Sequence, residues 1–262
     1  AVSGLDDQLD PGAISRLSRS GAVAFRAEFE AAPPPAGQRY WRGPVFTQYD
    51  GRRWRPGPDR KAPAPEPVSA GRTVAYTVML EPHYRRWLFA LDLPATAPPE
   101  GRLSRDLAPL AADRVRQMRR YRLRSYPDYR VQKQLGEDAR RRYLTLPEGV
   151  HPQARALAAK WRRTAGEPAA VVERALAYYR NGGFRYTLTP PKPGKDWVDG
   201  FLFDTRAGFC GHFAGSFAFL MRAAGVPARV VTGYLGGDMH PGGDYMIVRQ
   251  SDAHAWTEVW LA

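Results

Sequence analysis

Proline-rich segments divide the first 147 residues of this 262-residue chain into short pieces. They lie at 33–35, 56–67 and 94–99. Proline lacks a backbone N–H and its ring clashes with the preceding helical turn, so these segments exclude long helices. The intervening chain is therefore expected to be mostly β.

Alternating apolar residues predict strands at 23–29, 73–80 and 121–126. The segment 39–46 predicts another strand, and Asp50-Gly51 with the following Trp54 predicts a turn and an aromatic anchor. Together these patterns predict a mostly-β, sandwich-like domain at 1–147.

The pattern changes after Leu146-Pro147. Apolar residues at helical spacing predict helices at 153–164 and 168–180, and Asn181-Gly182-Gly183 is a typical end for the second. A short strand at 184–188 and three more near the end of the chain follow. We therefore predict an α+β second domain at 148–262.

Cys210 is the only cysteine, which excludes internal disulfides and metal sites with several cysteines. Phe213, Phe217, Leu220 and Met221 recur at helical spacing, so Cys210 lies in the first turn of a helix. Backbone N–H groups and the helix dipole favour a thiolate there. A reactive thiol and a structural cysteine both fit this position.

The last predicted strands are 228–234, 245–250 and 254–261. In the third, His254, Trp256, Glu258 and Trp260 share one face. A histidine at the start of a strand can point its imidazole at a neighbouring helix N-terminus and form the Cys–His pair of nucleophilic catalysis. A hydrogen-bonded surface histidine is the alternative.

Several motifs together resemble the transglutaminase-like superfamily of papain-type Cys-His-Asp enzymes. They are Gly208-Phe-Cys210, Gly225-Val-Pro-Ala-Arg229, Gly233-Tyr234 and Asp252-Ala-His254-Ala-Trp256-Thr-Glu258. Further segments resemble one branch, the bacterial membrane-anchored transglutaminases of the TgpA type. They are Phe201-Leu-Phe-Asp-Thr-Arg-Ala-Gly-Phe-Cys210, Gly236-Gly237, Tyr40-Trp-Arg-Gly43, Tyr49-Asp-Gly51 and Trp54.

The resemblance implies a papain-like core, in which the helix bearing the nucleophile packs on an antiparallel sheet. Cys210 would be the nucleophile and His254 its partner, and the third member of the triad, an Asp, is expected beyond Ala262. Asp252 belongs to an edge turn, and Glu258 lies roughly 13 Å along the strand from His254, so neither is assigned that role.

The implied activity is that of a protein-glutamine gamma-glutamyltransferase acting on protein or peptide substrates of the envelope or cell wall. The Cys210 backbone N–H is a candidate oxyanion donor. Trp197 is a candidate second donor or a core aromatic, and Tyr234 and Trp256 are candidate cleft walls. No metal or cofactor is implied, and no calcium-binding Asp-x-Asp-x-Asp-Gly loop is present.

Two alternatives remain open at this stage. The first is a cysteine protease or amidase on the same scaffold, because Cys–His chemistry does not select an amine over water. The second is a non-enzymatic domain that binds the envelope and carries a vestigial Cys–His pair.

The chain has 39 Lys and Arg against 26 Asp and Glu, a net charge of +13. Ten Arg lie between Arg114 and Arg142. This charge fits a solvated strand face, or binding to an anionic membrane surface or wall polymer; we predict no nucleic-acid partner, because no basic tail accompanies it.

No run of about 18 apolar residues and no signal peptide is found in the sequence. The resemblance nevertheless implies transmembrane helices that flank this region in the full-length protein. They would hold it in the periplasm, as a domain of an inner-membrane protein.

Overall fold

The structure is a computed structural model and describes residues 4–10, 13–58, 61–68 and 71–262. Parts of the N-terminal segment considered for a signal peptide (1–3 and 11–12) and of the proline-rich segment 56–67 lie outside these residues. Among the described residues, no helix combines the length and apolar content needed to cross a membrane.

The helices lie mostly in the second half of the chain. They are α1 (Ala13–Leu17), α2 (Glu137–Arg142), α3 (Pro152–Ala165), α4 (Pro168–Asn181), α5 (Trp197–Asp199) and α6 (Cys210–Ala223). The predictions at 153–164 and 168–180 are confirmed by α3 and α4, and both helices have Pro at their start, where its missing N–H costs nothing.

The strands are found throughout the chain. They are β1 (Val23–Phe29), β2 (Tyr40–Phe46), β3 (Gln48–Tyr49), β4 (Trp54–Arg55), β5 (Pro67–Val68), β6 (Val74–Leu80), β7 (Ala90–Leu91), β8 (Gly101–Leu103), β9 (Pro109–Ala111), β10 (Arg119–Ser125), β11 (Arg130–Val131), β12 (Arg185–Tyr186), β13 (Ala207–Gly208), β14 (Ala228–Leu235), β15 (Asp238–Met239), β16 (Met246–Arg249) and β17 (Ala253–Val259). The strand predicted at 184–188 is shorter, because only two residues pair, in parallel, with β13.

Two large sheets form the framework. One has the order β10-β6-β1-β16-β15 and the other β17-β14-β2-β7. Each sheet combines strands from before and after residue 147, so β1 pairs with β16 and β2 pairs with β14. The two parts of the chain are therefore joined through shared sheets, and the division into domains at 1–147 and 148–262 remains a proposal about its organisation.

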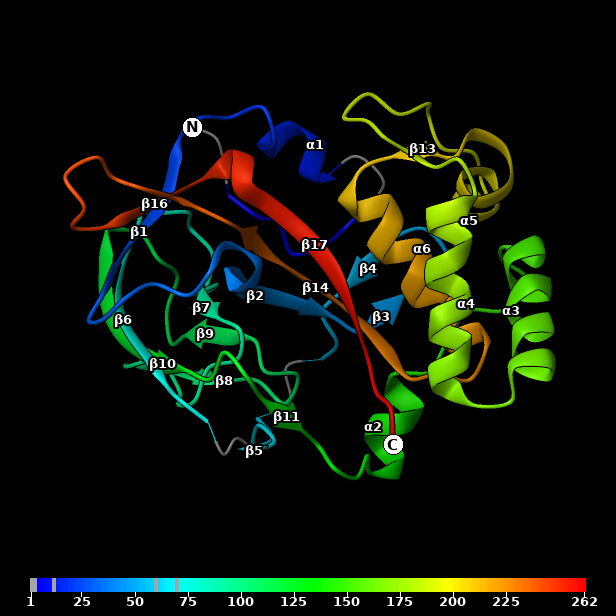
Figure 1. The fold of residues 1–262 in the computed structure, drawn as a ribbon, viewed down its shortest axis with the longest axis horizontal. Coiled ribbons are helices and arrows are strands. Elements are labelled where there is room, and N and C mark those ends of the chain that lie inside the picture. The colour runs from blue at the N-terminus through cyan, green and yellow to red at the C-terminus, as the bar shows by residue number, and fades with distance from the viewer. Residues whose placement is uncertain (1–3, 11–12, 59–60, 69–70) are drawn as a thin grey trace.

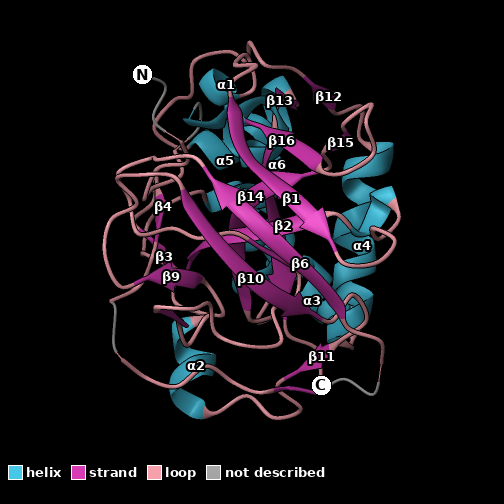
Figure 2. Ribbon diagram, turned by 90° about the vertical axis from the view of Figure 1, so that its left-hand side faces the viewer, coloured by secondary structure: helices cyan, strands magenta, loops and turns pink. Residues whose placement is uncertain are grey.

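The two sheets face one another through aromatic side chains, and Figure 2 shows β10, β6 and β1 in front of β14 and β2. The Phe25 ring lies 5.0 Å from that of Trp41 and 5.6 Å from that of Tyr234, and Trp41 lies 5.6 Å from Tyr76. All four side chains are almost completely buried. The predicted sandwich-like, mostly-β region followed by a helix packed on an antiparallel sheet is confirmed.

Helix α6 covers the end of the four-stranded sheet that the other sheet leaves free. The hydroxyl of Thr257 in β17 donates to the carbonyl of Ala214 in α6 at 2.7 Å. Helices α3 and α4 lie on the outer side of α6, as Figure 1 shows, so the helices gather at one end of the molecule.

The close approach of β2 and β14 depends on Gly233. A Cβ atom at this position would lie 1.8 Å from the carbonyl oxygen of Trp41, which no real side chain tolerates. Gly233 also pairs with His254 in β17. The Gly-Tyr motif is therefore a packing requirement of the strand beside the candidate histidine.

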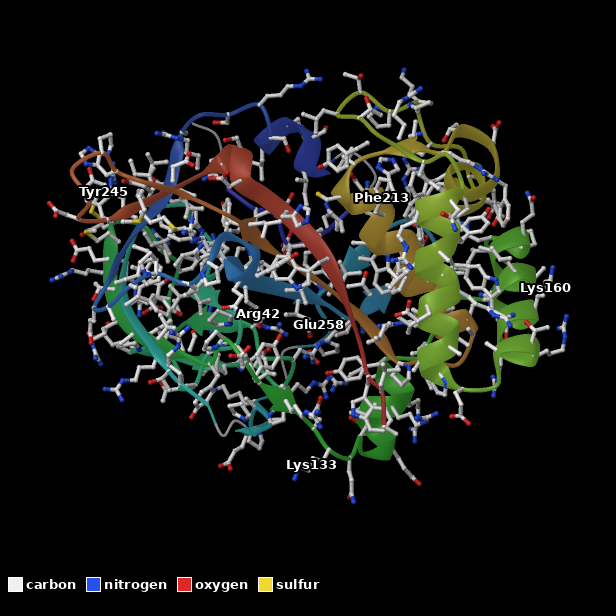
Figure 3. The ribbon with its side chains drawn as sticks, viewed as in Figure 1. Arg42, Lys133, Lys160, Phe213, Tyr245 and Glu258 are labelled. Atoms are coloured by element: carbon white, nitrogen blue, oxygen red, sulfur yellow. The ribbon has the colours of Figure 1, made fainter. Side chains whose placement is uncertain are left out.

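A buried arginine links the first half of the chain to its last strand. The guanidinium of Arg42 contacts both carboxylate oxygens of Glu258 and one oxygen of Asp92, and it also donates to the backbone carbonyls of Asp106 and Leu107. Figure 3 shows Arg42 and Glu258 next to one another. The coulombic attraction of Arg42 and Arg229 outweighs the effect of burial and lowers the pKa of Glu258 to about 2.

Removing this guanidinium should strongly destabilise the fold. Arg42→Met leaves Glu258 and Asp92 buried without their shared partner, which we expect to lower the free energy of unfolding by about 3–5 kcal/mol. Arg26→Met is the matched control, because Arg26 pairs with Glu81 at a half-exposed site and such pairs contribute about 0–1 kcal/mol. Denaturant titration checks both, and similar losses in the two variants would contradict the role given to Arg42.

Candidate active site

Cys210 is the first residue of α6 and is buried, with an exposed fraction of 3%. The helix begins here because Phe209 is extended and its backbone N–H is bound by a side chain of the first turn. That N–H donates to Nδ1 of His212 at 3.3 Å, and the His212 N–H donates back to the Phe209 carbonyl at 2.9 Å. His212 thus caps the helix that carries the thiol.

The thiol of Cys210 lies against β17. Burial raises the pKa of this thiol above its ordinary value, and the backbone N–H of Ala255 and the hydroxyl of Tyr186 counteract this in part by hydrogen bonding. The sequence analysis expected the helix N-terminus to favour a thiolate. In the folded chain the cost of desolvating the charge is larger, so the thiol is neutral at pH 7.

His254 lies in β17 next to Ala255, so its backbone is adjacent to the N–H that contacts the thiol. Its imidazole stacks on Trp256 at 6.3 Å between ring centroids, and burial lowers its pKa. No hydrogen bond joins this imidazole to the thiol in the described part of the chain. The structure therefore brings the two residues into one region, and burial favours the neutral form of each.

The two faces of β17 have different neighbours. Thr257 faces α6, whereas Trp256 and Glu258 belong to the face that carries Arg42. Trp256 packs edge-on against Tyr40, with ring centroids 5.1 Å apart. Trp256 therefore flanks His254 on the same face of the strand, as the alternation of the sequence predicts.

Neither of the carboxylates considered near His254 binds its imidazole. Both oxygens of Glu258 are bound by Arg42, and one of them also accepts a hydrogen bond from Nε of Arg229 at 2.8 Å. Asp252 accepts the backbone N–H of Arg249 at 2.8 Å and so closes the turn before β17. An Asp beyond Ala262 as the orienting acid remains a prediction.

Trp197 and Tyr234 lie within the core. The indole of Trp197 is 4% exposed and packs against the rings of His151 and His212. The Tyr234 hydroxyl donates to Gln250 at 2.7 Å, and its ring contacts Phe25 and Phe89. None of these contacts involves Cys210 or His254, and the buried Nε1 of Trp197 has no hydrogen-bond partner among the described residues. The roles of Trp197 as a donor and of Tyr234 as a cleft wall remain predictions.

Sequence reasoning did not assign Tyr186 to the site. Tyr186 reaches the thiol because β12 pairs in parallel with β13, which leads directly into Cys210. That pairing joins segments about twenty residues apart, and no sequence pattern within either segment predicts it. His212, in contrast, occupies the position three residues after the N-cap where a capping side chain is expected.

The described residues contain no group of three or more His, Cys, Asp or Glu side chains arranged to hold a metal ion. The groups that the arrangement offers for chemistry are the thiol, the imidazole and the backbone N–H groups at the start of α6.

Comparison with known proteins agrees with this geometry. Residues 1–132 match the TgpA N-terminal domain, and residues 155–262 match the transglutaminase-like superfamily. The chain is 43% identical to the crystallised periplasmic domain of TgpA from Pseudomonas aeruginosa, with a TM-score of 0.92, covering 99% of this chain and 90% of that one.

Two longer proteins are also similar. A protein-glutamine gamma-glutamyltransferase of Pseudomonas aeruginosa is 44% identical over 260 residues, which cover 99% of this chain and 39% of that protein. The uncharacterized protein YebA of Bacillus subtilis is 34% identical over 127 residues, covering 46% of this chain and 17% of that protein. The chain thus spans about two fifths of the length of its Pseudomonas relative.

Alkylation should report the neutral state of the thiol. We expect the rate of iodoacetamide reaction at Cys210 to rise with pH through a midpoint above the ordinary thiol value of about 8.5, because burial raises the pKa. Tyr186→Phe should move the midpoint higher still, since it removes a hydroxyl that stabilises the thiolate. Tyr84→Phe, at an exposed tyrosine, is the control. A midpoint below pH 7 would contradict this description.

His212 should make stability depend on pH. Burial lowers its pKa from 6.5 to about 4, so the unfolded chain binds more protons between these values and stability is lost as the pH falls through this window. This loss amounts to about 3 kcal/mol at most. His212→Gln keeps an acceptor at the capping position without titrating, so its unfolding free energy should fall less from pH 7 to pH 4. If the unfolding free energies of the unchanged protein and of His212→Gln fell equally from pH 7 to pH 4, this role of His212 would be refuted.

Proposed function

This chain belongs to the transglutaminase-like superfamily and carries the TgpA N-terminal domain, and from this we propose that it is the catalytic periplasmic portion of a protein-glutamine gamma-glutamyltransferase. The observation that carries the proposal is the position of Cys210, which is buried in the first turn of α6 and packed against β17. The thiol contacts the backbone N–H of Ala255, and His254 is the residue next to Ala255. The likeness to the Pseudomonas enzyme over nearly the whole chain supports it.

The first half of the reaction would form a thioester. The neutral imidazole of His254 accepts the thiol proton as the sulfur of Cys210 attacks the carboxamide carbon of a glutamine side chain. The carbon–nitrogen bond then breaks, and ammonia leaves with the proton that the imidazolium returns. Catalytic hydrogen bonds are often long before substrate binds, so thiol and imidazole need only approach in the substrate complex.

The second half would transfer the acyl group. A primary amine attacks the thioester carbon, its proton passes to His254, and the Cys210 sulfur leaves to give an isopeptide. The backbone N–H of Cys210 lies in the first turn of α6, where it has no acceptor within the helix, and this supports a role in binding the oxyanion. An Asp on a following segment would orient the imidazole.

Trp256 is suited to form a wall of the substrate cleft. Its ring is partly exposed and lies on the same face of β17 as His254. Tyr234 is a core residue and would support the site through packing. The Nε1 of Trp197, which has no hydrogen-bond partner among the described residues, keeps Trp197 a candidate second oxyanion donor.

The same proposal includes location and partners. The Pseudomonas relative of known structure is a periplasmic domain, so we propose that this chain lies on the periplasmic side of the inner membrane, within a protein anchored there. The net charge of +13 suits substrates on an anionic membrane surface or cell wall.

Amine incorporation tests the proposal. We expect the protein to attach a labelled primary amine to a glutamine-containing peptide and to release ammonia, and Cys210→Ala to abolish this. His254→Ala should reduce the rate by at least about a hundredfold, because general acid–base catalysis contributes that much or more. His83→Ala is the control, since His83 binds the backbone of Trp87 in the first half of the chain.

The alternatives are outcomes of the same assay. Hydrolysis of the glutamine peptide or of its backbone without amine incorporation would indicate an amidase or protease instead. Full activity in Cys210→Ala would exclude the thiol mechanism altogether.

A further inference from the structure

A cavity of about 240 Å³ opens in the first half of the chain, apart from the thiol and the imidazole. Its lining comes from the residues after β4, the segment before β7, and the segment from Ser104 to Arg114 that includes β9. None of the lining residues belongs to α6 or β17. We call it the basic cavity.

Its lining carries more positive than negative side chains, although Arg85 also pairs with Asp6 and Asp7, which lie outside the lining. The lining contains four arginines and one carboxylate; they are Arg85, Arg86, Arg105, Arg114 and Asp106. The carboxylate of Asp106 is already bound by the guanidinium of Arg142 at 2.7 Å and by the Tyr143 hydroxyl. It therefore does little to neutralise the arginines that line the cavity.

Two of the lining residues have buried donors without an acceptor. In the part of the chain that the structure describes, neither Nε1 of Trp87 nor Nε of Arg105 has a hydrogen-bond partner. The Arg105 side chain is only 13% exposed, and its Nη1 forms an ion pair with Asp138 at 3.6 Å. A buried donor left unsatisfied costs about 1–3 kcal/mol, and an acceptor in the cavity would recover this cost.

Apart from Ser104, the rest of the lining is apolar. Val45, Ala108 and Leu110 are buried, and Pro56 and Pro58 complete this part. A volume of about 240 Å³ is below the usual range for a complete drug-sized ligand, so it fits one charged group with a short hydrocarbon portion.

We propose that the basic cavity is a binding site for an oxyanion, a phosphate or carboxylate group carried on a small apolar body. The ligand's oxygens would accept the N–H groups of Trp87 and Arg105, and the neighbouring arginines would supply the charge. Arginine suits this role because its planar donors match both kinds of oxyanion. The site is independent of the acyl-transfer proposal, so its test measures binding and not activity.

Calorimetric titration at low salt provides the test, with inorganic phosphate and glutarate as separate probes. We expect at least one probe to bind with 1:1 stoichiometry, and Trp87→Phe to weaken it about tenfold or more. This variant keeps the aromatic ring and removes only the N–H, and a hydrogen bond to a charged group is worth at least that factor. The probe that binds identifies the ligand as phosphate-bearing or carboxylate-bearing.

Two further variants control for folding and for general charge. Arg105→Lys keeps the charge but loses Nε–H, and it should weaken binding like Trp87→Phe. Arg163→Gln removes one charge from an exposed position in α3 and should leave the dissociation constant within about twofold. Absence of saturable binding by both probes, or equal weakening in Arg163→Gln and Arg105→Lys, would overturn the proposal.

Discussion

The burial of Arg42 is the constraint on which the arrangement of the chain depends. A guanidinium with no exposed surface must have its donors satisfied, and here they are bound by Glu258, Asp92 and two backbone carbonyls. These acceptors come from β17 and from the segments after β7 and β8. The arginine therefore links three distant parts of the chain to β2, and it binds the face of β17 opposite the one that faces α6.

The chemistry of the candidate site follows from that orientation. With Glu258 held by Arg42, Thr257 faces α6, and the N–H of Ala255 lies at the Cys210 thiol. Burial raises the pKa of the Cys210 thiol and lowers the pKa of the His254 imidazole. Both shifts favour the neutral forms of the two groups in the folded chain, which is the starting state of the proposed mechanism.

The positive charge of the chain has two different structural roles. Arg42 and Arg229 are internal, and with Glu258 they hold strands together. The arginines of the basic cavity, in contrast, line an open space beside two donors that have no acceptor among the described residues, and Arg85 and Arg105 also pair with exposed carboxylates. A net charge counted from composition cannot separate these roles, because burial and partners are properties of the fold.

The sequence by itself determined the local elements. The periodicity of apolar residues predicted β1, β6, α3, α4 and the helix that begins at Cys210, because side-chain alternation and helical spacing are short-range properties. It also placed His254, Trp256 and Glu258 on one face of a strand. The motifs around Cys210 and His254 were sufficient to indicate the family.

Only the tertiary structure decided how these elements meet. Strands from both ends of the chain share each sheet, Tyr186 reaches the thiol through a short parallel pair, and Trp197 and Tyr234 lie in the core. It also paired Glu258 with Arg42 and Arg229. Such contacts join residues more than two hundred positions apart, as Arg42 and Glu258 are, and they depend on which surfaces are buried against one another. No pattern within a single segment contains that information.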